Sequence, residues 1–439
     1  MINKKLLKRV LPLAIGLSSL FPTQSNAELP WIIKPRPTIL SRLENLIETR
    51  NNNNFSLFSP IYSFPNLMNN SNLEGDIKKA VDQNNVGEIY ETPVLDQDEL
   101  MKVAVVYPKS GLESKTGDIL NPIIYMPGYS AGASVYLDYA NNLAENGYLV
   151  LIPEINGDTI HFFSIDSVND NFIEFERGTL LDRLQNIKNE VQKVEGYESY
   201  DTLLEVGNLV MIHAIGGEVQ NQKVLDIIDK NLFKYRDDAL DSTVQLAYEI
   251  NQDKNSPLYG RIDTENIGLE GHSLGPHSIF TILSEKNPPF WVKDIKAFIS
   301  KGGISGFQSL DRVSKIGNNS SGKYPYVYFM LGEHDVENTV LQSSWDRFQV
   351  LDVPAVYTLL NGAGHMVFTP FPLSFITDKY TSFGDRSITM QEDLSAQKTY
   401  IEISKTFFDA VLKNDKKAMK RIKRENFDGI KESYTINFE

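Results

Sequence analysis

The stretch IGLEGHSLGPHSIF, residues 267–280, passes from a β-branched apolar run into a glycine, a histidine, a serine and a second glycine. The apolar residues before the first glycine are typical of a buried strand, and those after Pro276 are typical of a helix. Proline is tolerated in the first turn of a helix, where a backbone N–H has no partner within the helix. The two glycines therefore flank a serine at a sharp strand-to-helix turn.

Residues 271–275, GHSLG, fit the G-x-S-x-G pattern, in which a serine on a strained turn is exposed as a nucleophile. Side chains two residues before and after the serine would collide across so sharp a turn, which accounts for both glycines. The alternative is a tight turn without chemistry, because a five-residue pattern recurs by chance. The strand before it and the helix after it are the context that a nucleophile needs.

Apolar runs alternate with amphipathic stretches over residues 76–412. Continuous apolar runs separated by helices predict a mostly parallel sheet covered by helices on both faces, which is an α/β fold. Helices are expected over 133–147, from 275, and over 340–350 and 396–414. Strands are expected within residues 101–108, 122–128, 148–154, 266–271, 295–300, 324–332 and 354–360.

The segments at the two ends differ from this domain in composition. Residues 1–27 are expected to be a secretory signal, because four cations precede a short apolar run that ends in Ser-Asn-Ala; an uncleaved anchor is the alternative. Residues 28–75, rich in proline and asparagine, are interpreted as an N-terminal extension. Residues 413–439 are interpreted as a basic C-terminal tail.

A long insertion is expected before the nucleophile strand, over about residues 156–235. Two helical stretches, 176–191 and 235–250, lie on either side of an apolar segment at 203–215. That segment is either a lid over an apolar site or a peripheral addition, and the sequence leaves both open.

Composition and charge narrow the class of protein. The chain has no cysteine, so an exported protein of this kind has no disulfides and depends on its core for stability. The formal charge is −14, and removal of the four cations in residues 1–27 takes it to −18. Such acidity argues against nucleic acid or an anionic membrane as a general partner. The basic run near the C-terminus is either the solvated face of a helix or a local contact with a membrane or an anion: Lys413, Lys416, Lys417, Lys420, Arg421, Lys423 and Arg424.

A serine hydroxyl needs a base to take its proton, so a histidine must lie beside it. His365 directly follows a predicted strand and a glycine-rich turn, which makes it the expected base. His334 is its rival, since it adjoins the best acid. His272 and His277 adjoin the serine and are not expected to point across the site mouth. The six histidines of the chain are His161, His213, His272, His277, His334 and His365.

Asp335 is the expected acid, because it follows a predicted strand and would hold the imidazole in one tautomer. Ser273, Asp335 and His365 then occur in the chain order that G-x-S-x-G hydrolases use, each at the carboxyl end of a strand. The sequence therefore predicts a catalytic triad. Weaker candidates for the acid are Glu333, Glu337 and Asp311.

Negative charge that develops on a substrate oxygen needs backbone N–H donors. One expected donor is the amide of Leu274, at the start of the helix after the serine. The second is expected from the loop after the strand IIYMPG, where Gly128 lets the chain bend, the amide of Tyr129 donates, and Ser130 stands behind it. The alternative is an ordinary glycine-rich turn. No cluster of metal ligands stands out, and the expected chemistry needs no cofactor.

Two blocks of sequence carry a resemblance to a known family: YGRIDTENIGLEGHSLG at 259–275 and IIYMPGYSAGASVYLDYANNLAENGYLVLIPE at 123–154. They resemble α/β-hydrolases of the branch that holds the plasma-type platelet-activating-factor acetylhydrolases, the dienelactone-hydrolase-like proteins and the cutinase-like polyesterases. The resemblance covers about residues 95–410 and implies the α/β-hydrolase fold. Many relatives carry another glycine where this chain has Pro276 followed by His277. The roles implied are nucleophile for Ser273, acid for Asp335, base for His365, and oxyanion donors for Tyr129 and Leu274.

These features favour a secreted serine ester hydrolase that acts through an acyl-enzyme on carboxylic esters, lipid and phospholipid acyl esters among them, in the periplasm or outside the cell. A serine peptidase of the same fold is one alternative, although such peptidases carry a large extra domain. A catalytically idle hydrolase fold used for binding is another, although it would lack a triad member. The expected partner is a small-molecule or lipid ester, with transient contact to a lipid surface and no nucleic acid. Three aromatic residues after the base could line an acyl pocket or belong to the core: Phe368, Phe371 and Phe375.

Overall fold

The computed structural model of the chain has the α/β architecture that the sequence predicts. Residues 1–27, which are expected to be a signal, and residues 28–75, which are interpreted as an extension, lie outside the part that this structure describes. The described residues are 85–94, 100–109, 119–128, 132–155, 180–201, 205–206, 209–210, 221–303, 314, 316, 325–335, 337–369, 379–381, 387–424 and 427–437.

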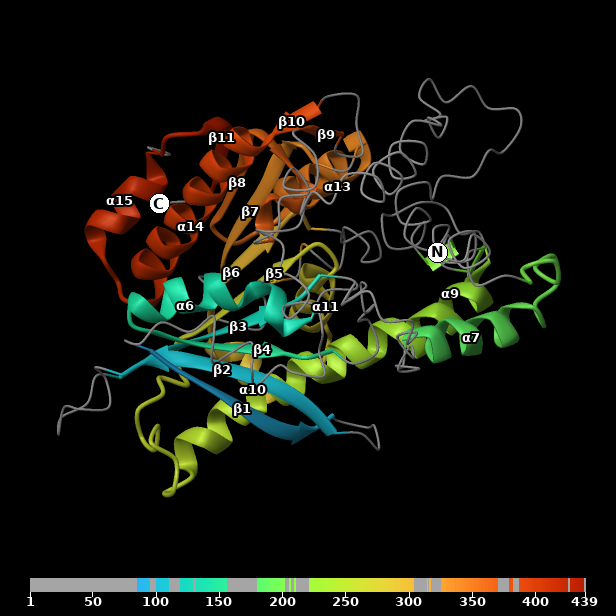
Figure 1. Cartoon of the computed structure of the whole chain (residues 1–439), viewed down its shortest axis with the longest axis horizontal. Helices are drawn as coiled ribbons and strands as arrows, with labels where there is room; N and C mark the ends of the chain where they lie inside the picture. The colour runs from blue at the N-terminus through green and yellow to red at the C-terminus, as the bar shows by residue number, and fades with distance from the viewer. Residues whose placement is uncertain are drawn as a thin grey trace, which may run out of the picture.

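A mixed β-sheet forms the centre of the described chain (Figure 1). Within the described residues it has nine strands, in the order β1-β2-β4-β3-β5-β6-β7-β8-β11, and a separate two-stranded ribbon pairs β9 with β10. The strands are β1 (Asn85–Pro93), β2 (Leu100–Pro108), β3 (Asn121–Met126), β4 (Tyr148–Pro153), β5 (Ile267–His272), β6 (Ile295–Lys301), β7 (Tyr326–His334), β8 (Ala355–Gly364), β9 (Lys379–Thr381), β10 (Ser387–Thr389) and β11 (Ile430–Ile436).

The sheet is mostly parallel, as the continuous apolar runs predict. Strand β3 pairs in parallel with β4 and β5, and β5, β6, β7 and β8 continue in parallel. Antiparallel pairs occur only towards the two edges of the described sheet, where β2 meets β4, β1 meets β2 and β11 meets β8. Since parallel strands end at one common edge, the residues after β3, β5, β6, β7 and β8 are brought together there.

Helices cover both faces of the sheet. On one face α10 packs against β3 and β4, α11 against β5 and α13 against β7 and β8; on the other, α6 packs against β2 and β4, and α14 against β6 and β8. The helical segments are η3 (Ala133–Tyr136), α6 (Leu137–Glu145), α7 (Leu180–Val191), α9 (Gln222–Ile228), the π-helical turn η4 (Asp229–Phe233), α10 (Lys234–Gln252), α11 (Gly275–Leu283), η5 (Phe290–Asp294), α13 (Glu337–Val350), η6 (His365–Phe368), α14 (Met390–Leu412) and α15 (Lys416–Lys423).

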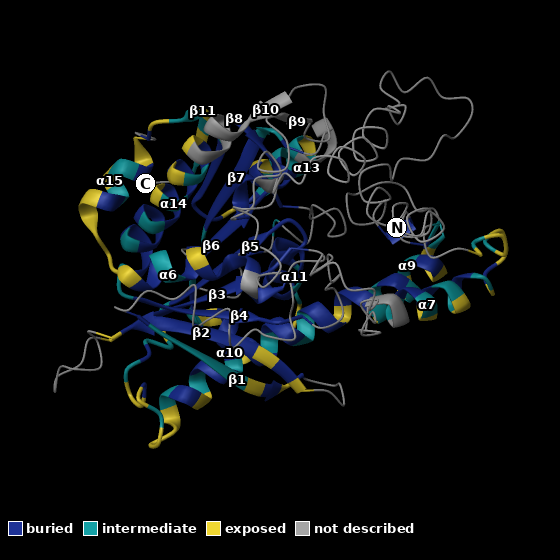
Figure 2. Ribbon diagram, viewed as in Figure 1, coloured by how far each residue is buried: buried dark blue, intermediate teal, exposed yellow. Residues whose placement is uncertain are grey.

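Alternation of side chains along the strands divides the apolar core into two clusters. In β3, Ile124 and Met126 belong to the cluster under α10 and α11, whereas Ile123 and Tyr125 belong to the cluster under α6 and α14. Successive side chains of a strand point to opposite faces, so a run that is buried throughout needs a cover on both sides. Figure 2 shows the central strands dark blue between the two helical layers.

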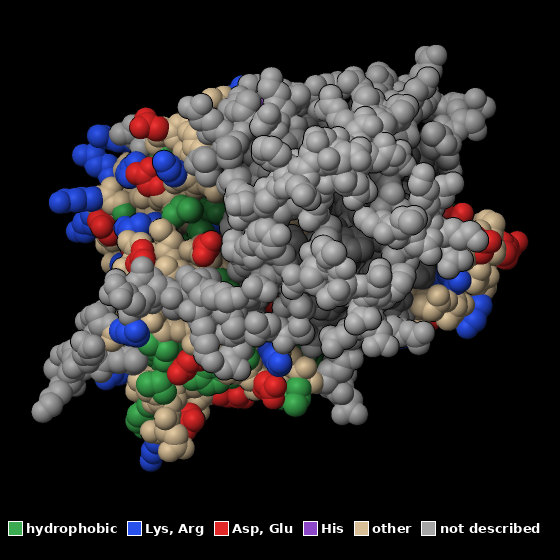
Figure 3. Space-filling model, in the orientation of Figure 1, with side chains coloured by type: hydrophobic (Ala, Val, Ile, Leu, Met, Phe, Trp, Pro, Cys, Tyr) green, Lys and Arg blue, Asp and Glu red, His purple; other side chains and the backbone are tan. Residues whose placement is uncertain are grey.

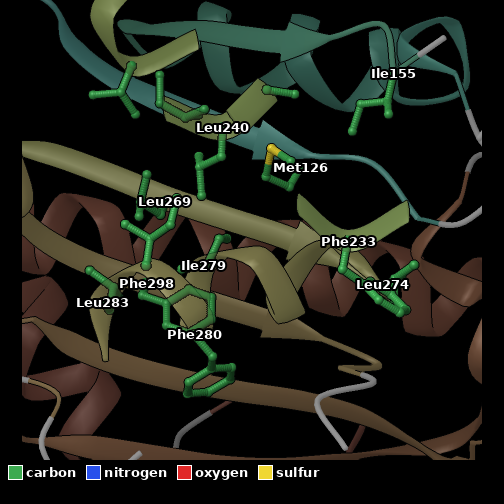
Figure 4. Close-up of a cluster of buried hydrophobic side chains, with 14 of the residues drawn as sticks. Met126, Ile155, Phe233, Leu240, Leu269, Leu274, Ile279, Phe280, Leu283 and Phe298 are labelled. Atoms are coloured by element: carbon green, nitrogen blue, oxygen red, sulfur yellow. The ribbon is translucent and has the colours of Figure 1, made fainter. Parts of the chain in front are cut away.

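The first cluster includes the helix that follows the proposed nucleophile turn. Its residues Ile279, Phe280 and Leu283 lie in one cluster with Leu269 of β5 and Phe298 of β6 (Figure 4). The rings of Phe280 and Phe298 meet edge to face, with centroids 4.8 Å apart. Burying each such side chain stabilises the fold by roughly 1.5–3 kcal/mol, so α11 is held firmly on the sheet.

The described part of the insertion packs on the core. Val206, Leu209 and Val210 are buried and belong to the same apolar cluster as Ile228 and Phe233. The remainder of the predicted apolar segment, including His213, lies outside the described residues, as do residues 156–179 with His161. The helical stretch expected at 235–250 is the central part of α10, whose apolar side faces the sheet.

Residues beyond 412 add to the helical layer of α14 and to the sheet. Strand β11 pairs antiparallel with β8, so the sheet extends into the segment that composition groups as a basic tail. Helix α15 buries Ala418 and Ile422 and leaves most of its cations exposed, and Figure 3 shows blue side chains gathered at the left edge, where Figure 1 places α15. The Lys413 ammonium donates a hydrogen bond to the carbonyl of Asn146, just before β4. This contact lies at the edge of the sheet opposite to the carboxyl ends of the parallel strands.

Within the described residues, no helix combines the length and the apolar character needed to cross a membrane.

Candidate active site

Five residues that follow parallel strands meet at the carboxyl edge of the sheet. Gly128 follows β3, Ser273 follows β5, Gly302 follows β6, Asp335 follows β7 and His365 follows β8. This edge is where α/β sheets place their sites, because loops from neighbouring strands converge there. The fold therefore brings together Ser273, Asp335 and His365, the three residues that the sequence predicts to act together.

The turn at Ser273 has the strained backbone that its sequence predicts. Ser273 has φ +56°, a left-handed conformation that costs a non-glycine residue roughly 1–3 kcal/mol. A side chain at Gly275 would place its Cβ 2.2 Å from the carbonyl oxygen of Met126, and one at Gly271 would place it 2.7 Å from the nitrogen of Pro276. Both glycines are therefore required by close backbone approach.

A backbone hydrogen bond ties this turn to the neighbouring strand. The Ser273 amide donates to the carbonyl of Lys301 at 2.8 Å, and α11 begins two residues later at Gly275. Because the helix starts immediately after the serine, its positive N-terminal end lies close to the hydroxyl. The turn thus holds the Ser273 hydroxyl in a fixed position near the partial positive charge at the start of α11.

His365 joins the hydroxyl to the carboxylate. Its Nδ1 lies 2.6 Å from Oδ1 of Asp335, and its Nε2 lies 2.9 Å from Oγ of Ser273. An ionised carboxylate only accepts, so Nδ1–H donates to Asp335 and the unprotonated Nε2 accepts from the serine hydroxyl. All three residues are buried. This arrangement can take a proton from Ser273 and stabilise the resulting imidazolium, which is the chemistry of a Ser-His-Asp triad.

Gly302 lies directly against Asp335 and His365. It has φ +51°, and a Cβ there would lie 3.1 Å from Oδ2 of Asp335 and 3.1 Å from Nδ1 of His365. Its amide donates to the carbonyl of Met330 in β7 at 2.8 Å. The absence of a side chain at this position allows the aspartate and the imidazole to approach each other.

One predicted oxyanion donor is described and the other is not. The Leu274 amide lies at the N-terminal end of α11, next to Ser273, where a helix presents free N–H groups. Tyr129, the second expected donor, lies outside the described residues, and so does Ser130. The amide of Gly128, the residue before Tyr129, donates a hydrogen bond to the hydroxyl of Tyr136 at 3.0 Å.

The peptide between Pro127 and Gly128 passes directly beside the nucleophile. A Cβ on Gly128 would lie 3.2 Å from Cβ of Ser273. At the other end of the same peptide, the carbonyl of Pro127 accepts a hydrogen bond from the fully buried guanidinium of Arg236 on α10. The loop that leads to Tyr129 is therefore held at both polar ends of one peptide group.

The rival base and the rival acids take other partners or lie outside the described residues. His334 pairs with Glu333 at 3.8 Å, and the carboxylate of Glu333 accepts hydrogen bonds from Lys431 and from the Gly362 amide. Burial alone would raise the pKa of Glu333, but these two hydrogen bonds together with the charges of His334 and Lys431 outweigh it and lower the pKa. Asp311 and the side chain of Glu337 are not among the described residues.

A buried ion pair lies beneath the site, and the sequence analysis did not assign it. Glu270 and Lys301 are fully buried and lie 2.7 Å apart, across β5 and β6. Glu270 also accepts from the hydroxyls of Tyr139 and Ser404, and the Lys301 ammonium lies 3.6 Å from the ring centroid of Tyr139. Burial lowers the pKa of Lys301 to about 8 against the opposing effect of Glu270. The sequence signal for this pair is that an acidic residue stands in one mostly apolar strand and a basic residue stands in the next.

Of the three aromatic residues considered for an acyl pocket, only Phe368 is described. It is buried in the core under α14, with ring centroid distances of 5.8 Å to His272 and 5.5 Å to Tyr400. Phe368 therefore packs against His272, the residue before Ser273, and belongs to the core.

His277 is a second buried histidine outside the triad. Its ring lies against Phe233 of η4, with centroids 4.8 Å apart. This contact joins the insertion to α11, which is a packing role.

No group of three or more acidic, histidine or cysteine side chains in the described part of the chain is arranged to hold a metal ion.

Comparison with known proteins adds no assignment: no protein-family model matches the chain, and a search of curated proteins finds no significant match.

Proposed function

We propose that this chain is an exported serine ester hydrolase with an α/β-hydrolase fold. The observation that carries the proposal is the hydrogen-bonded series from Ser273 through His365 to Asp335, with distances of 2.9 and 2.6 Å. Each member follows a parallel strand, and the serine has the strained conformation of a nucleophile on a strand-to-helix turn. The order serine, aspartate, histidine along the chain supports the same fold.

In the first step the serine oxygen attacks the ester carbonyl carbon. Nε2 of His365 takes the hydroxyl proton as the bond between Oγ of Ser273 and the carbonyl carbon forms, and the carbonyl oxygen becomes an oxyanion. Backbone amides stabilise that charge, with Leu274 as one donor and Tyr129 as the other. When the carbon–oxygen bond to the leaving group breaks, the leaving oxygen takes the proton from His365, and an acyl-serine ester and an alcohol result.

In the second step water reverses these roles. His365 takes a proton from the water, whose oxygen bonds to the acyl carbon, and the bond between that carbon and Oγ of Ser273 then breaks. The proton returns to the serine, and a carboxylic acid is released. Asp335 remains ionised throughout and holds the imidazole with Nδ1–H towards itself. No step needs a metal or an organic cofactor.

The proposed substrates are carboxylic esters, with lipid and phospholipid acyl esters as the class to examine first. This choice follows from the resemblance of residues 123–154 and 259–275 to the acetylhydrolase and polyesterase branch of the α/β-hydrolases. The secretory signal expected at residues 1–27 supports the proposal that the enzyme acts in the periplasm or outside the cell. The strongly negative charge of the chain argues against nucleic acid as a partner.

The test is a substrate panel with the wild-type protein and Ser273→Ala. The panel contains p-nitrophenyl esters from acetate to palmitate, a diacyl phospholipid and a peptide p-nitroanilide. The proposal predicts ester hydrolysis by the wild type that Ser273→Ala abolishes, with both proteins unfolding at similar temperatures because the change removes one hydroxyl. Cleavage of the anilide without the esters would favour a peptidase, and no turnover of any substrate would favour a binding protein.

A further inference from the structure

His272, the residue before the nucleophile, has a defined set of hydrogen bonds although the triad does not use it. Its Nε2 lies 3.1 Å from the backbone carbonyl oxygen of His365, and its Nδ1 lies 3.0 Å from the hydroxyl of Tyr136. That hydroxyl in turn lies 3.0 Å from the amide nitrogen of Gly128. The three contacts form a continuous series from the loop after β3 to the residue that carries the base.

The chemistry of the groups fixes the direction of every hydrogen bond in this series. A backbone carbonyl only accepts, so Nε2 of His272 carries the proton and donates to His365. Burial, together with the neighbouring His365, lowers the pKa of His272 well below its ordinary value, so the ring is neutral and Nδ1 accepts. Burial also keeps the pKa of Tyr136 well above its ordinary value, so its hydroxyl keeps its proton, donates to Nδ1 and accepts from the Gly128 amide.

The peptide at the start of this series leads to the expected second oxyanion donor. Its carbonyl accepts from Arg236 and its N–H donates to Tyr136, so both polar ends are held. Gly128 lies against the nucleophile, and a Cβ there would be 3.2 Å from the Tyr136 hydroxyl, from Nδ1 of His272 and from Cβ of Ser273. A shift of this peptide would therefore move the loop relative to the serine.

We infer that Tyr136 and His272 are positioning residues that hold the peptide between Pro127 and Gly128 in register with His365, so that this peptide, the nucleophile and the base keep one arrangement around a substrate carbonyl. The inference rests on the proposed function. Neither side chain is hydrogen-bonded to a reacting atom. Tyr136 acts through the Gly128 amide, and His272 acts through the backbone carbonyl of His365 and through its ring, whose centroid lies 5.0 Å from that of the His365 imidazole. Loss of the series should weaken transition-state binding more than substrate binding.

The direct test is Tyr136→Phe, which removes the hydroxyl and keeps the ring. With a short p-nitrophenyl ester we expect kcat to fall by about 10- to 100-fold with little change in KM, since a misplacement of ~1 Å costs about 100-fold. The dissociation constant of a trifluoromethyl ketone, whose adduct with the serine places an oxyanion in the same position, should rise by the factor by which kcat/KM falls. The matched control is Tyr328→Phe, which removes the equally buried hydroxyl that contacts Thr358 at 2.8 Å, and it should change neither constant.

A second variant tests whether the two residues act in series. His272→Gln keeps an N–H donor near the position of Nε2 and removes the acceptor for Tyr136. It should resemble Tyr136→Phe, and the double variant should be no worse than either single one, because breaking one series twice costs no more than breaking it once. Additive losses would overturn the inference, and so would a Tyr136→Phe variant that keeps its kcat or that loses activity only through a raised KM.

The wild type separates the two proposals. If it hydrolyses esters and Tyr136→Phe behaves as the Tyr328→Phe control does, the positioning role alone is wrong. If the wild type neither hydrolyses esters nor reacts with a fluorophosphonate, the proposed function fails, and the positioning role fails with it.

Discussion

Substitution of Gly302 by alanine tests the geometry of the site without touching a reacting atom. The new methyl would lie 3.1 Å from Nδ1 of His365 and 3.2 Å from its Cε1, which is closer than ordinary contact between such atoms, and 3.1 Å from Oδ2 of Asp335. Either the imidazole or the carboxylate must therefore move by a few tenths of an ångström. Since a displacement of ~1 Å costs about 100-fold in rate, we expect kcat to fall by roughly 10-fold.

Backbone strain from the same substitution has to be separated from this effect. Gly302 has φ +51°, where a Cβ costs roughly 1–2 kcal/mol. Gly260 offers a matched control, because it has φ +66° and a Cβ there would meet no heavy atom within 4 Å. Gly260→Ala should lower the unfolding free energy by a similar amount and leave kcat unchanged.

The assay compares initial rates on p-nitrophenyl butyrate with melting temperatures for the wild type and both alanine variants. The account predicts that both variants lose stability and that only Gly302→Ala loses kcat. A Gly302→Ala variant with wild-type kcat would refute the reasoning that the Asp335–His365 pair is tightly enclosed. Equal losses of kcat in both variants would show that strain, and not the contact with the pair, is responsible.

Four further substitutions have defined outcomes. His365→Ala should reduce kcat/KM for esters as far as loss of the nucleophile does, whereas Asp335→Asn should retain roughly 10- to 100-fold more activity; full activity of the histidine variant would point to His334 as the base. Asp237 has a buried carboxyl oxygen, and burial raises its pKa to about 8, so the folded state holds a proton that the unfolded state releases near pH 4. The contribution of Asp237 to stability should therefore fall as pH rises from about 4 to 8, by up to about 1.4 kcal/mol per pH unit, and urea unfolding of Asp237→Asn should lack this loss over that range; an identical pH dependence in the two proteins would contradict the assignment. Leu209→Ala should lower the unfolding free energy by about 2–5 kcal/mol and reduce hydrolysis of short and long esters together, because Leu209 is buried in the main core; a loss confined to long esters in a protein of unchanged melting temperature would instead indicate a lid.

Strands whose pattern is local and continuous could be predicted from the sequence. The runs that form β3, β4, β5 and β6 are buried along almost their whole length, so each is mostly apolar and is recognisable without knowledge of its neighbours. The turn at Ser273 was also predictable, because its two glycines are required by contacts within a few residues and with the adjacent strand.

The edge strands could not be predicted in this way. Strand β11 alternates half-buried and exposed residues over IKESYTI, so its composition resembles that of a solvated segment. Strand β1, NVGEIYETP, is half-buried along most of its length. Each is a strand only because β8 or β2 offers a free edge for pairing, which is a property of the assembled sheet.

The supporting residues of the site were not predictable, because they come together only in the fold. Arg236 stands in KYRDDAL, which reads as a solvated helical turn, yet its guanidinium is fully buried against the carbonyl of Pro127. Tyr136 and His272 are 136 positions apart and meet through a hydrogen bond and an edge contact between their rings. By contrast, the triad could be predicted because strand ends in a parallel sheet share one edge, so chain position after a strand is enough to bring residues together.

The central claim is that Ser273 is an activated nucleophile, and covalent capture tests it most directly. A fluorophosphonate should phosphonylate a serine hydroxyl only where a base has activated it, with fluoride as the leaving group. The account predicts that mass spectrometry of the digested protein finds one adduct, on Ser273, and that His365→Ala prevents its formation. An adduct on another serine, or labelling that persists at the same rate in Ser273→Ala, would contradict the account.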